Sequence, residues 1–146
     1  KQVVGYVDLI QSVGSLSLLD EIEKVAAAKG LVQDILLEVN VGAEESKSGF
    51  APEAVLPLLD RIDQYPNIRI KGLMAIPPIS QKDGDNIKYF KKMCNISVDI
   101  IGKKYDNVKV ECISMGMSQD FPDAIANGST MIRVGTAIFG ARDYRK

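Results

Sequence analysis

Short runs of apolar and β-branched residues alternate along the chain with longer segments in which apolar residues recur at helical spacing. The apolar runs predict strands at residues 3–13, 33–41, 68–76, 108–114 and 130–135. The segments between them predict helices at residues 15–30, 52–65, 85–105 and 119–128. Ser15 or Ser17 is suited to cap the first helix, and Gly30 is suited to end it.

The repeated strand–helix order predicts an α/β fold with a parallel sheet, because consecutive parallel strands need a long crossover segment between them. Near-continuous apolar segments such as 33–41 are typical of strands that are buried on both faces. Right-handed crossovers leave two architectures open, a doubly wound sheet and part of a (β/α) barrel of the TIM type. No linker rich in Pro, Gly or Ser divides the 146 residues, so one domain is expected.

Polar residues and glycines lie just beyond the predicted strands. Ligands of parallel α/β folds bind beyond the carboxyl ends of the strands. The sequence places Asn40, the segment SMGMS (114–118) and the segment RVGT (133–136) there. Hydroxyl groups, glycines and one cation in this setting favour an anion held by backbone N–H groups. Barrels often bind phosphate after their last two strands, which predicts a phosphate site in the last third of this chain.

Several of these residues also have a purely structural explanation. Gly116 is equally consistent with a simple turn, and Ser118 is suited to cap the helix predicted from residue 119. That helix would also direct its positive N-terminus at the site. Arg133 lies within the apolar segment MIRVG, so it must face a site or pair with a carboxylate. We therefore favour a site role for Arg133.

Composition narrows the classes of function. Net charge is −1 and the 18 Lys and Arg residues are scattered, so no nucleic-acid-binding face is expected. No run approaches the roughly 20 apolar residues that span a membrane. The chain has no His, which excludes a His-based triad, and its two cysteines match neither a CxxC site nor a disulfide framework. Both are interpreted as reduced thiols of a cytoplasmic protein. Neither a GxGxxG nor a P-loop motif is present.

The segments ESKxG, GLM, SMGMSxD and RxGTxIFG occur in this order along the chain. With them the sequence resembles the pyridoxal phosphate homeostasis protein family, whose barrel is similar to the N-terminal barrel of alanine racemase. The resemblance extends over residues 1–146. It implies a protein that binds pyridoxal 5′-phosphate (PLP), is not an enzyme and buffers or delivers PLP in the cell. It also implies a phosphate cradle at Ser118, Gly135 and Thr136 with Ser114 nearby, and an Arg133 that faces the pyridine nitrogen.

Other family segments have no counterpart in this sequence, namely the AVSK segment with the Schiff-base lysine, a Gly-Glu-Asn and HFIGxLQ. We therefore expect residues 1–146 to be the C-terminal portion of a (β/α)8 barrel, about strands 4–8, with the covalent lysine absent from this chain. The family barrel is expected to be monomeric. An incomplete barrel leaves strands 3–13 and 130–135 with open edges, so self-association of this chain is expected.

Two other interpretations remain open. The chain is also compatible with a fragment of a fold-type III PLP enzyme such as an amino-acid racemase, which needs a lysine and a second acid–base group. A truncated fragment that binds nothing is the other alternative. Lys47 is a candidate for weak covalent attachment to PLP, although the neighbouring Glu44 and Glu45 favour its charged form.

Overall fold

The computed structural model describes residues 2–44, 46–80 and 82–140. Five parallel strands form one sheet in the sequential order β1-β2-β3-β4-β5. The strands are β1 (Leu9–Val13), β2 (Gln33–Glu38), β3 (Ile68–Met74), β4 (Val108–Met117) and β5 (Met131–Arg133). The α-helices are α1 (Leu16–Lys29), α2 (Val55–Leu59), α3 (Ile87–Gly102), α4 (Phe121–Ala126) and α5 (Thr136–Phe139), and two 3-10 helices, Pro52–Ala54 and Ile62–Gln64, flank α2.

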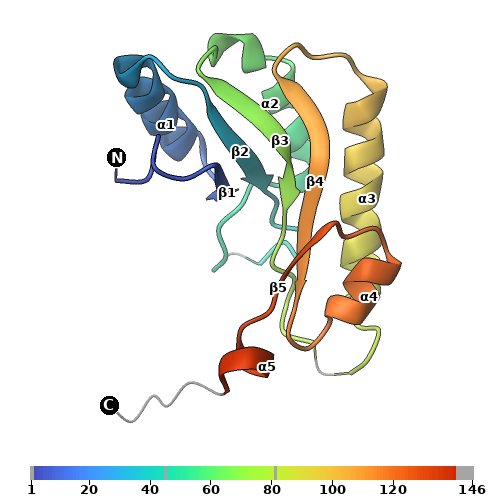
Figure 1. The fold of residues 1–146 in the computed structure, drawn as a ribbon. Coiled ribbons are helices and arrows are strands. Elements are labelled where there is room, and N and C mark those ends of the chain that lie inside the picture. Colours follow the sequence, from blue (N-terminus) through green and yellow to red (C-terminus); the bar gives the residue numbers. More distant parts are fainter. Residues whose placement is uncertain (1, 45, 81, 141–146) are drawn as a thin grey trace.

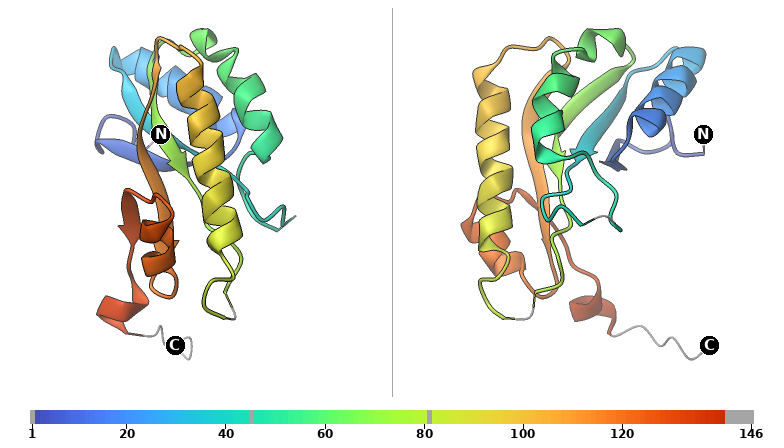
Figure 2. Two further views of the ribbon diagram at one scale, coloured as in Figure 1. Left: turned by 90° about the vertical axis from the view of Figure 1, so that its right-hand side faces the viewer. Right: turned by 180° about the vertical axis from the view of Figure 1, so that it is seen from behind.

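The sequential strand order decides between the two predicted architectures. A doubly wound sheet reverses direction midway, whereas here each strand lies beside the next one in the chain. Helices α1, α2 and α3 lie behind and beside the sheet in Figure 1 and in front of it in the right-hand view of Figure 2. The predicted partial TIM-type barrel is thereby confirmed as a five-stranded parallel half-barrel. Which strands of a full barrel these are remains a prediction.

The core lies between the convex face of the sheet and the helices. Ile35 and Leu37 of β2 contribute to it, as do Ile113 and Met115 of β4, because every second strand residue points to that side. The helices supply apolar side chains at helical spacing. These are Leu19, Ile22 and Ala26 of α1, Val55, Leu58 and Leu59 of α2, and Phe90, Met93, Ile96 and Ile100 of α3.

Gly72 interrupts the alternation of β3. Ile68, Ile70 and Leu73 all belong to the core, although strict alternation would bring residue 72 there instead of residue 73. The register between β3 and β4 shifts between Ile70 and Gly72. The backbone of Gly72 has φ of +146°, and a Cβ there would overlap the carbonyl oxygen of Cys112 on β4. Only glycine allows this close approach. The shift determines which side chains of the carboxyl halves of β3 and β4 face the concave side.

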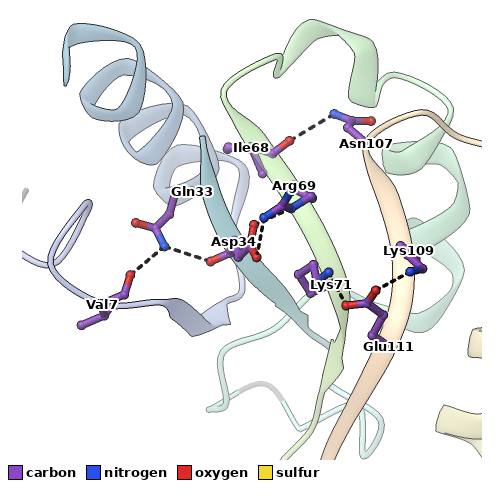
Figure 3. Close-up of polar contacts among 9 residues, drawn as sticks. All are labelled: Val7, Gln33, Asp34, Ile68, Arg69, Lys71, Asn107, Lys109 and Glu111. Atoms are coloured by element: carbon purple, nitrogen blue, oxygen red, sulfur yellow. Dashed lines mark hydrogen bonds and ion pairs between the residues drawn. The ribbon is translucent and has the colours of Figure 1, made fainter. Parts of the chain in front are cut away.

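The concave face carries charges near the amino ends of the strands (Figure 3). Arg69 of β3 donates two hydrogen bonds to Asp34 of β2, at 2.7 and 2.9 Å. Glu111 of β4 pairs with Lys71 and with Lys109, and these two cations lower the pKa of Glu111 to about 2. The expectation that the strands are buried on both faces is therefore wrong for this part of the sheet.

Several predicted boundaries are also wrong. Residues 3–8 form turns instead of a strand, because Gln33 accepts a hydrogen bond from Gly5 N and donates one to Val7 O (Figure 3). Instead of the helix predicted at 52–65, a short α2 is flanked by two 3-10 helices. Pro57 lies within α2 and has no N–H to donate to the carbonyl oxygen of Glu53, which agrees with the change of helix type before α2. The short helix α5, over the sequence TAIF, was not predicted.

The start and end of α1 agree with the prediction. Ser15 accepts a hydrogen bond from Leu18 N as the N-cap, and Gly30 adopts the left-handed conformation as the C-cap. Among the described residues, β1 and β5 each pair with one neighbouring strand. Self-association through these edges remains a prediction. None of the helices in the described ranges is both long and apolar enough to cross a membrane.

Candidate functional site

A cavity of about 810 Å³ lies at the carboxyl ends of β3, β4 and β5. Its polar wall contains three of the residues predicted to form the phosphate cradle. Apolar side chains, among them Ile79, Met117 and Phe139, line another part of it. The residues that line it are Lys47, Ile76, Pro77, Pro78, Ile79, Ser80, Met117, Ser118, Gln119, Asp120, Gly135, Thr136, Phe139 and Gly140.

The Ser118 hydroxyl joins the end of β4 to the start of α5. Its Oγ accepts hydrogen bonds from Gly135 N and Ala137 N, each at 3.2 Å. A hydroxyl that accepts two bonds still has its own proton to donate. The N–H groups of Gly135 and Ala137 are used in these two bonds, and Ser118 presents its own O–H donor at the start of α5. The predicted neighbourhood of Ser118, Gly135 and Thr136 is present in the structure.

Gly135 and Thr136 leave room beside Ser118. A Cβ built on Gly135 would meet no atom within 4 Å, so the backbone is open on that side. Thr136 is exposed and occupies the first position of α5, where an N–H has no acceptor within the helix. Together these residues supply donors and the space that a bound oxyanion would fill.

The predicted capping role of Ser118 at the following helix is wrong. Helix α4 starts two residues later than expected, after Asp120, and no side chain caps it. The Asp120 carboxylate accepts hydrogen bonds from Met117 N at 2.7 Å and from Asn86 Nδ2 at 2.6 Å. It thereby fixes the turn between β4 and α4. Sequence reasoning missed this role, although an Asp three residues after a strand end is a recognisable turn signal.

Gly116 has the structural explanation that the sequence left open. Its φ is +92°, and a Cβ there would lie 2.5 Å from Ala124 Cβ and 3.1 Å from Phe121 Cα. Glycine is therefore required for β4 to pack against α4.

Arg133 and Ser114 lie apart from the lining of the cavity. Arg133 Nη1 donates to Ser114 Oγ at 2.6 Å, and Nη2 donates to the carbonyl oxygen of Ala75 at 2.9 Å. Ser114 is fully buried, and its flanking residues point into the core, so its side chain faces the concave side. The structure thus places Ser114 beside the guanidinium group, and Ser114 does not line the cavity.

Burial and neighbouring charges determine the electrostatics around Arg133. Burial lowers the pKa of Arg133, while the carboxylates of Glu38 and Asp120 act in the opposite direction. Burial raises the pKa of Glu38, and the positive charge of Arg133 partly offsets that rise. Arginine remains charged under such shifts. The negative charge that acts on Arg133 includes Glu38, a residue that the sequence analysis did not single out.

Lys47 also reaches the cavity. Its Nζ donates to Pro77 O at 3.1 Å and pairs with Glu44 at 2.5 Å. Asn40 holds this loop, because its side chain bonds the backbone of Glu44 and the carbonyl oxygen of Lys47. Glu45, the other flanking carboxylate, lies outside the described residues. Asn40 therefore lies just after β2, as predicted, but its side chain holds the backbone of the loop that contains Glu44 and Lys47.

Comparison with known proteins identifies the class to which this site belongs. Residues 1–143 match the family model described as alanine racemase, N-terminal domain, and the chain belongs to that family. Among solved structures below 25% identity, diaminopimelate decarboxylase from M. jannaschii in complex with L-lysine superimposes with a TM-score of 0.72 at 12% identity, over 87% of this chain and 38% of that one. That similarity concerns the fold alone.

More similar relatives carry a more specific name. The pyridoxal phosphate homeostasis protein of Aquifex aeolicus (strain VF5) is 43% identical over 144 residues, which are 99% of this chain and 62% of that protein. The protein of that name from Haemophilus influenzae is 35% identical, over 97% of this chain and 60% of its own length. The resemblance expected from the motifs is confirmed. The chain spans about three fifths of the length of these relatives.

The structure of one relative has been solved both with and without PLP. PipY of Synechococcus elongatus PCC7942 superimposes with a TM-score of 0.84 at 29% identity without PLP. With PLP bound the TM-score is 0.80 at 28% identity, and the superposition covers 95% of this chain and 64% of PipY.

Proposed function

We propose that this chain contributes the phosphate-binding part of a PLP site, and that the protein acts in PLP homeostasis as a non-catalytic carrier or buffer. One observation carries the proposal, namely the Ser118 hydroxyl that accepts the N–H groups of Gly135 and Ala137 on the wall of the cavity. The name of the relatives and the PLP-bound structure of PipY support it.

The residues of the cavity fit a phosphate ester in their chemistry. Ser118 and Thr136 offer hydroxyl groups, and Thr136, the first residue of α5, offers its backbone N–H next to the open side of Gly135. Asp120 also lines the cavity, but its two carboxylate oxygens already accept hydrogen bonds from Met117 N and Asn86 Nδ2. A cavity of about 810 Å³ is within the usual range for a small-molecule site.

Arg133 supports the non-catalytic part of the proposal. When bound, PLP supplies an aldehyde and an electron-withdrawing pyridine ring. We place Arg133 at the pyridine nitrogen, where its positive charge disfavours protonation of the ring. A neutral pyridine withdraws electrons less strongly than a pyridinium does. Storage of PLP is then favoured over the chemistry of a racemase.

We further propose that residues 1–146 correspond to the C-terminal part of an eight-stranded barrel, about strands 4–8. The order of the motifs and the sequential five-stranded half-barrel support this assignment. The concave face supports it too, because its ion pairs are suited to a barrel interior shared with further strands. The lysine that attaches PLP covalently would then lie outside this chain.

Substitutions in the cradle test the proposal directly. Ser118→Ala is expected to weaken the binding of PLP and of inorganic phosphate roughly tenfold, about 1.4 kcal/mol, because it removes the hydroxyl donor. Gly135→Val is expected to weaken binding further, since its side chain would fill the open space beside Ser118 without disturbing packing. Isothermal titration calorimetry measures both effects.

Ser17→Ala is the matched control for the serine, because Ser17 is exposed on α1 and, among the described residues, its hydroxyl forms a hydrogen bond only with that of Ser15. It should bind both ligands as the parent does. Equal affinities in the parent, Ser118→Ala and Gly135→Val would place the phosphate elsewhere and refute the proposed site.

Lys47 provides a separate test at the edge of the same cavity. Its ammonium group is engaged by Glu44 and Pro77 O, so we expect little or no covalent modification by PLP. Treatment with PLP and borohydride, followed by peptide mapping, measures the modified fraction. Lys88 on α3 contacts the Tyr89 ring and serves as the reference for unselective labelling. Labelling of Lys47 well above that of Lys88 would instead support attachment at Lys47.

A further inference from the structure

Gln11 reaches from one edge of the sheet to the other across the concave face. It lies on β1, yet its Oε1 accepts a hydrogen bond of 2.8 Å from Ser114 Oγ on β4. Its Nε2 contacts Met131 Sδ on β5 at 3.2 Å. β1 and β5 are the two edge strands of the sheet, so the curvature of the half-barrel brings these side chains together.

The donors and acceptors around Ser114 have only one consistent arrangement. Arg133 can only donate, so Ser114 Oγ must accept the bond from Nη1. The single hydroxyl proton of Ser114 is then directed to Gln11 Oε1. A reversed Gln11 amide would face Ser114 with a second donor and leave the buried hydroxyl proton without an acceptor. Gln11 thus sets the direction of a chain of hydrogen bonds that ends at the guanidinium group.

Arg133 needs such a restraint because other groups attract it. The carboxylates of Glu38 and Asp120 both act on its charge. Hydrogen bonds to Ser114 Oγ and Ala75 O hold the guanidinium in one place against that attraction. If Gln11 cannot accept the Ser114 proton, the hydroxyl is left with an unsatisfied donor and the guanidinium loses a fixed partner.

We propose that Gln11 is a positioning residue which, through Ser114, holds Arg133 so that the site prefers phosphate esters with a ring nitrogen. This inference rests on the proposed function, in which Arg133 faces the pyridine nitrogen. In this proposal Gln11 acts on the ligand through Ser114 and Arg133. Gln11 contributes to the selectivity between ligands, whereas Ser118 and Thr136 bind the phosphate group.

Two ligands that differ only at the ring nitrogen test the proposal. Pyridin-3-ylmethyl phosphate has the nitrogen and the ring position of the phosphate arm that PLP has, and benzyl phosphate lacks the nitrogen. The parent chain is expected to prefer the pyridine ester. Gln11→Leu, which removes the acceptor at similar volume, is expected to bind the pyridine ester about tenfold more weakly, a change of about 1.4 kcal/mol. Its affinity for benzyl phosphate should stay the same.

Three further variants separate positioning from simple damage. Gln11→Glu keeps an acceptor for Ser114 and should retain the preference. Ser114→Ala interrupts the same chain and should lose the preference, with little additional loss in the double variant Gln11→Leu/Ser114→Ala. Gln64→Leu, at an exposed glutamine of the 3-10 helix Ile62–Gln64, should behave as the parent does.

The outcomes are distinct. An equal loss for both esters in Gln11→Leu, or no loss for either, overturns the positioning role. Loss of the preference in Gln11→Glu as well as in Gln11→Leu also overturns it, because the acceptor is then not what matters. A parent chain that binds neither ester refutes the proposed function itself, and this inference with it. Urea unfolding of every variant shows whether a loss of affinity is caused by a poorly folded protein. If Gln11→Leu folds poorly, the preference measured in Gln11→Glu and Ser114→Ala tests the positioning role.

Discussion

Gly72→Ala is expected to lower the free energy of unfolding by about 4 kcal/mol or more, a large fraction of the 5–15 kcal/mol typical of a domain. An alanine at φ of +146° is strained by about 1–3 kcal/mol. Its Cβ would also overlap the carbonyl oxygen of Cys112, so β3 would have to move away from β4 and lose hydrogen bonds between the strands. Urea unfolding followed by circular dichroism measures the change.

Gly102→Ala is the matched control for this substitution. A Cβ at Gly102, the last residue of α3, meets no atom within 4 Å. Alanine there restricts the unfolded chain and should stabilise the protein by about 0.4–1 kcal/mol. A Gly72→Ala protein within about 1 kcal/mol of the parent would show that the shift in β3 does not depend on glycine.

Gly72 matters for the site as well as for stability. Because of the shift at Gly72, the core residues Ile70 and Leu73 are three positions apart instead of the two that a regular strand has. Beyond this shift, Ser114 of β4 lies beside Met74 and points to the concave side. Partly folded Gly72→Ala protein is therefore expected to lose the orientation of Arg133 together with its stability.

Arg133→Glu is expected to weaken PLP binding at least about a hundredfold, or about 2.7 kcal/mol. The substitution removes the positive charge that we place at the pyridine nitrogen, together with the hydrogen bonds to Ser114 Oγ and Ala75 O that hold this charge in place. It also adds a carboxylate in a half-buried position that already faces Glu38. Inorganic phosphate should bind within about threefold of the parent, because we place Arg133 at the ring and Ser118 at the phosphate.

The comparison needs two controls. Arg61→Glu makes the same change of charge at an exposed position, where Arg61 contacts Gln64 at 3.4 Å, and should leave both affinities unchanged. Arg133→Gln removes the charge without adding a carboxylate and should have an intermediate effect. If Arg133→Glu weakens phosphate and PLP equally, Arg133 belongs to the phosphate cradle. If it weakens neither, Arg133 has no role in binding.

The sequence by itself determined the order of the elements and the family. Apolar spacing is a local property, so it located the five strands and the helices between them. Local caps determined both ends of α1, at Ser15 and Gly30. The motifs around Ser118 and Arg133 were sufficient to predict the family to which the chain belongs.

Only the tertiary structure decided what individual side chains do. Ser118 was equally suited to cap the helix after it, and it bonds instead to Gly135 and Ala137 across the fold. Ser114 was expected near the phosphate cradle, and the structure shows that its hydroxyl group joins Gln11 to Arg133. These partners are far apart in the chain and are brought together by the curvature and register of the sheet. Residue spacing and secondary-structure propensity describe only neighbours in sequence. They therefore could not show which of several possible hydrogen-bond partners each of these side chains would meet in the folded protein.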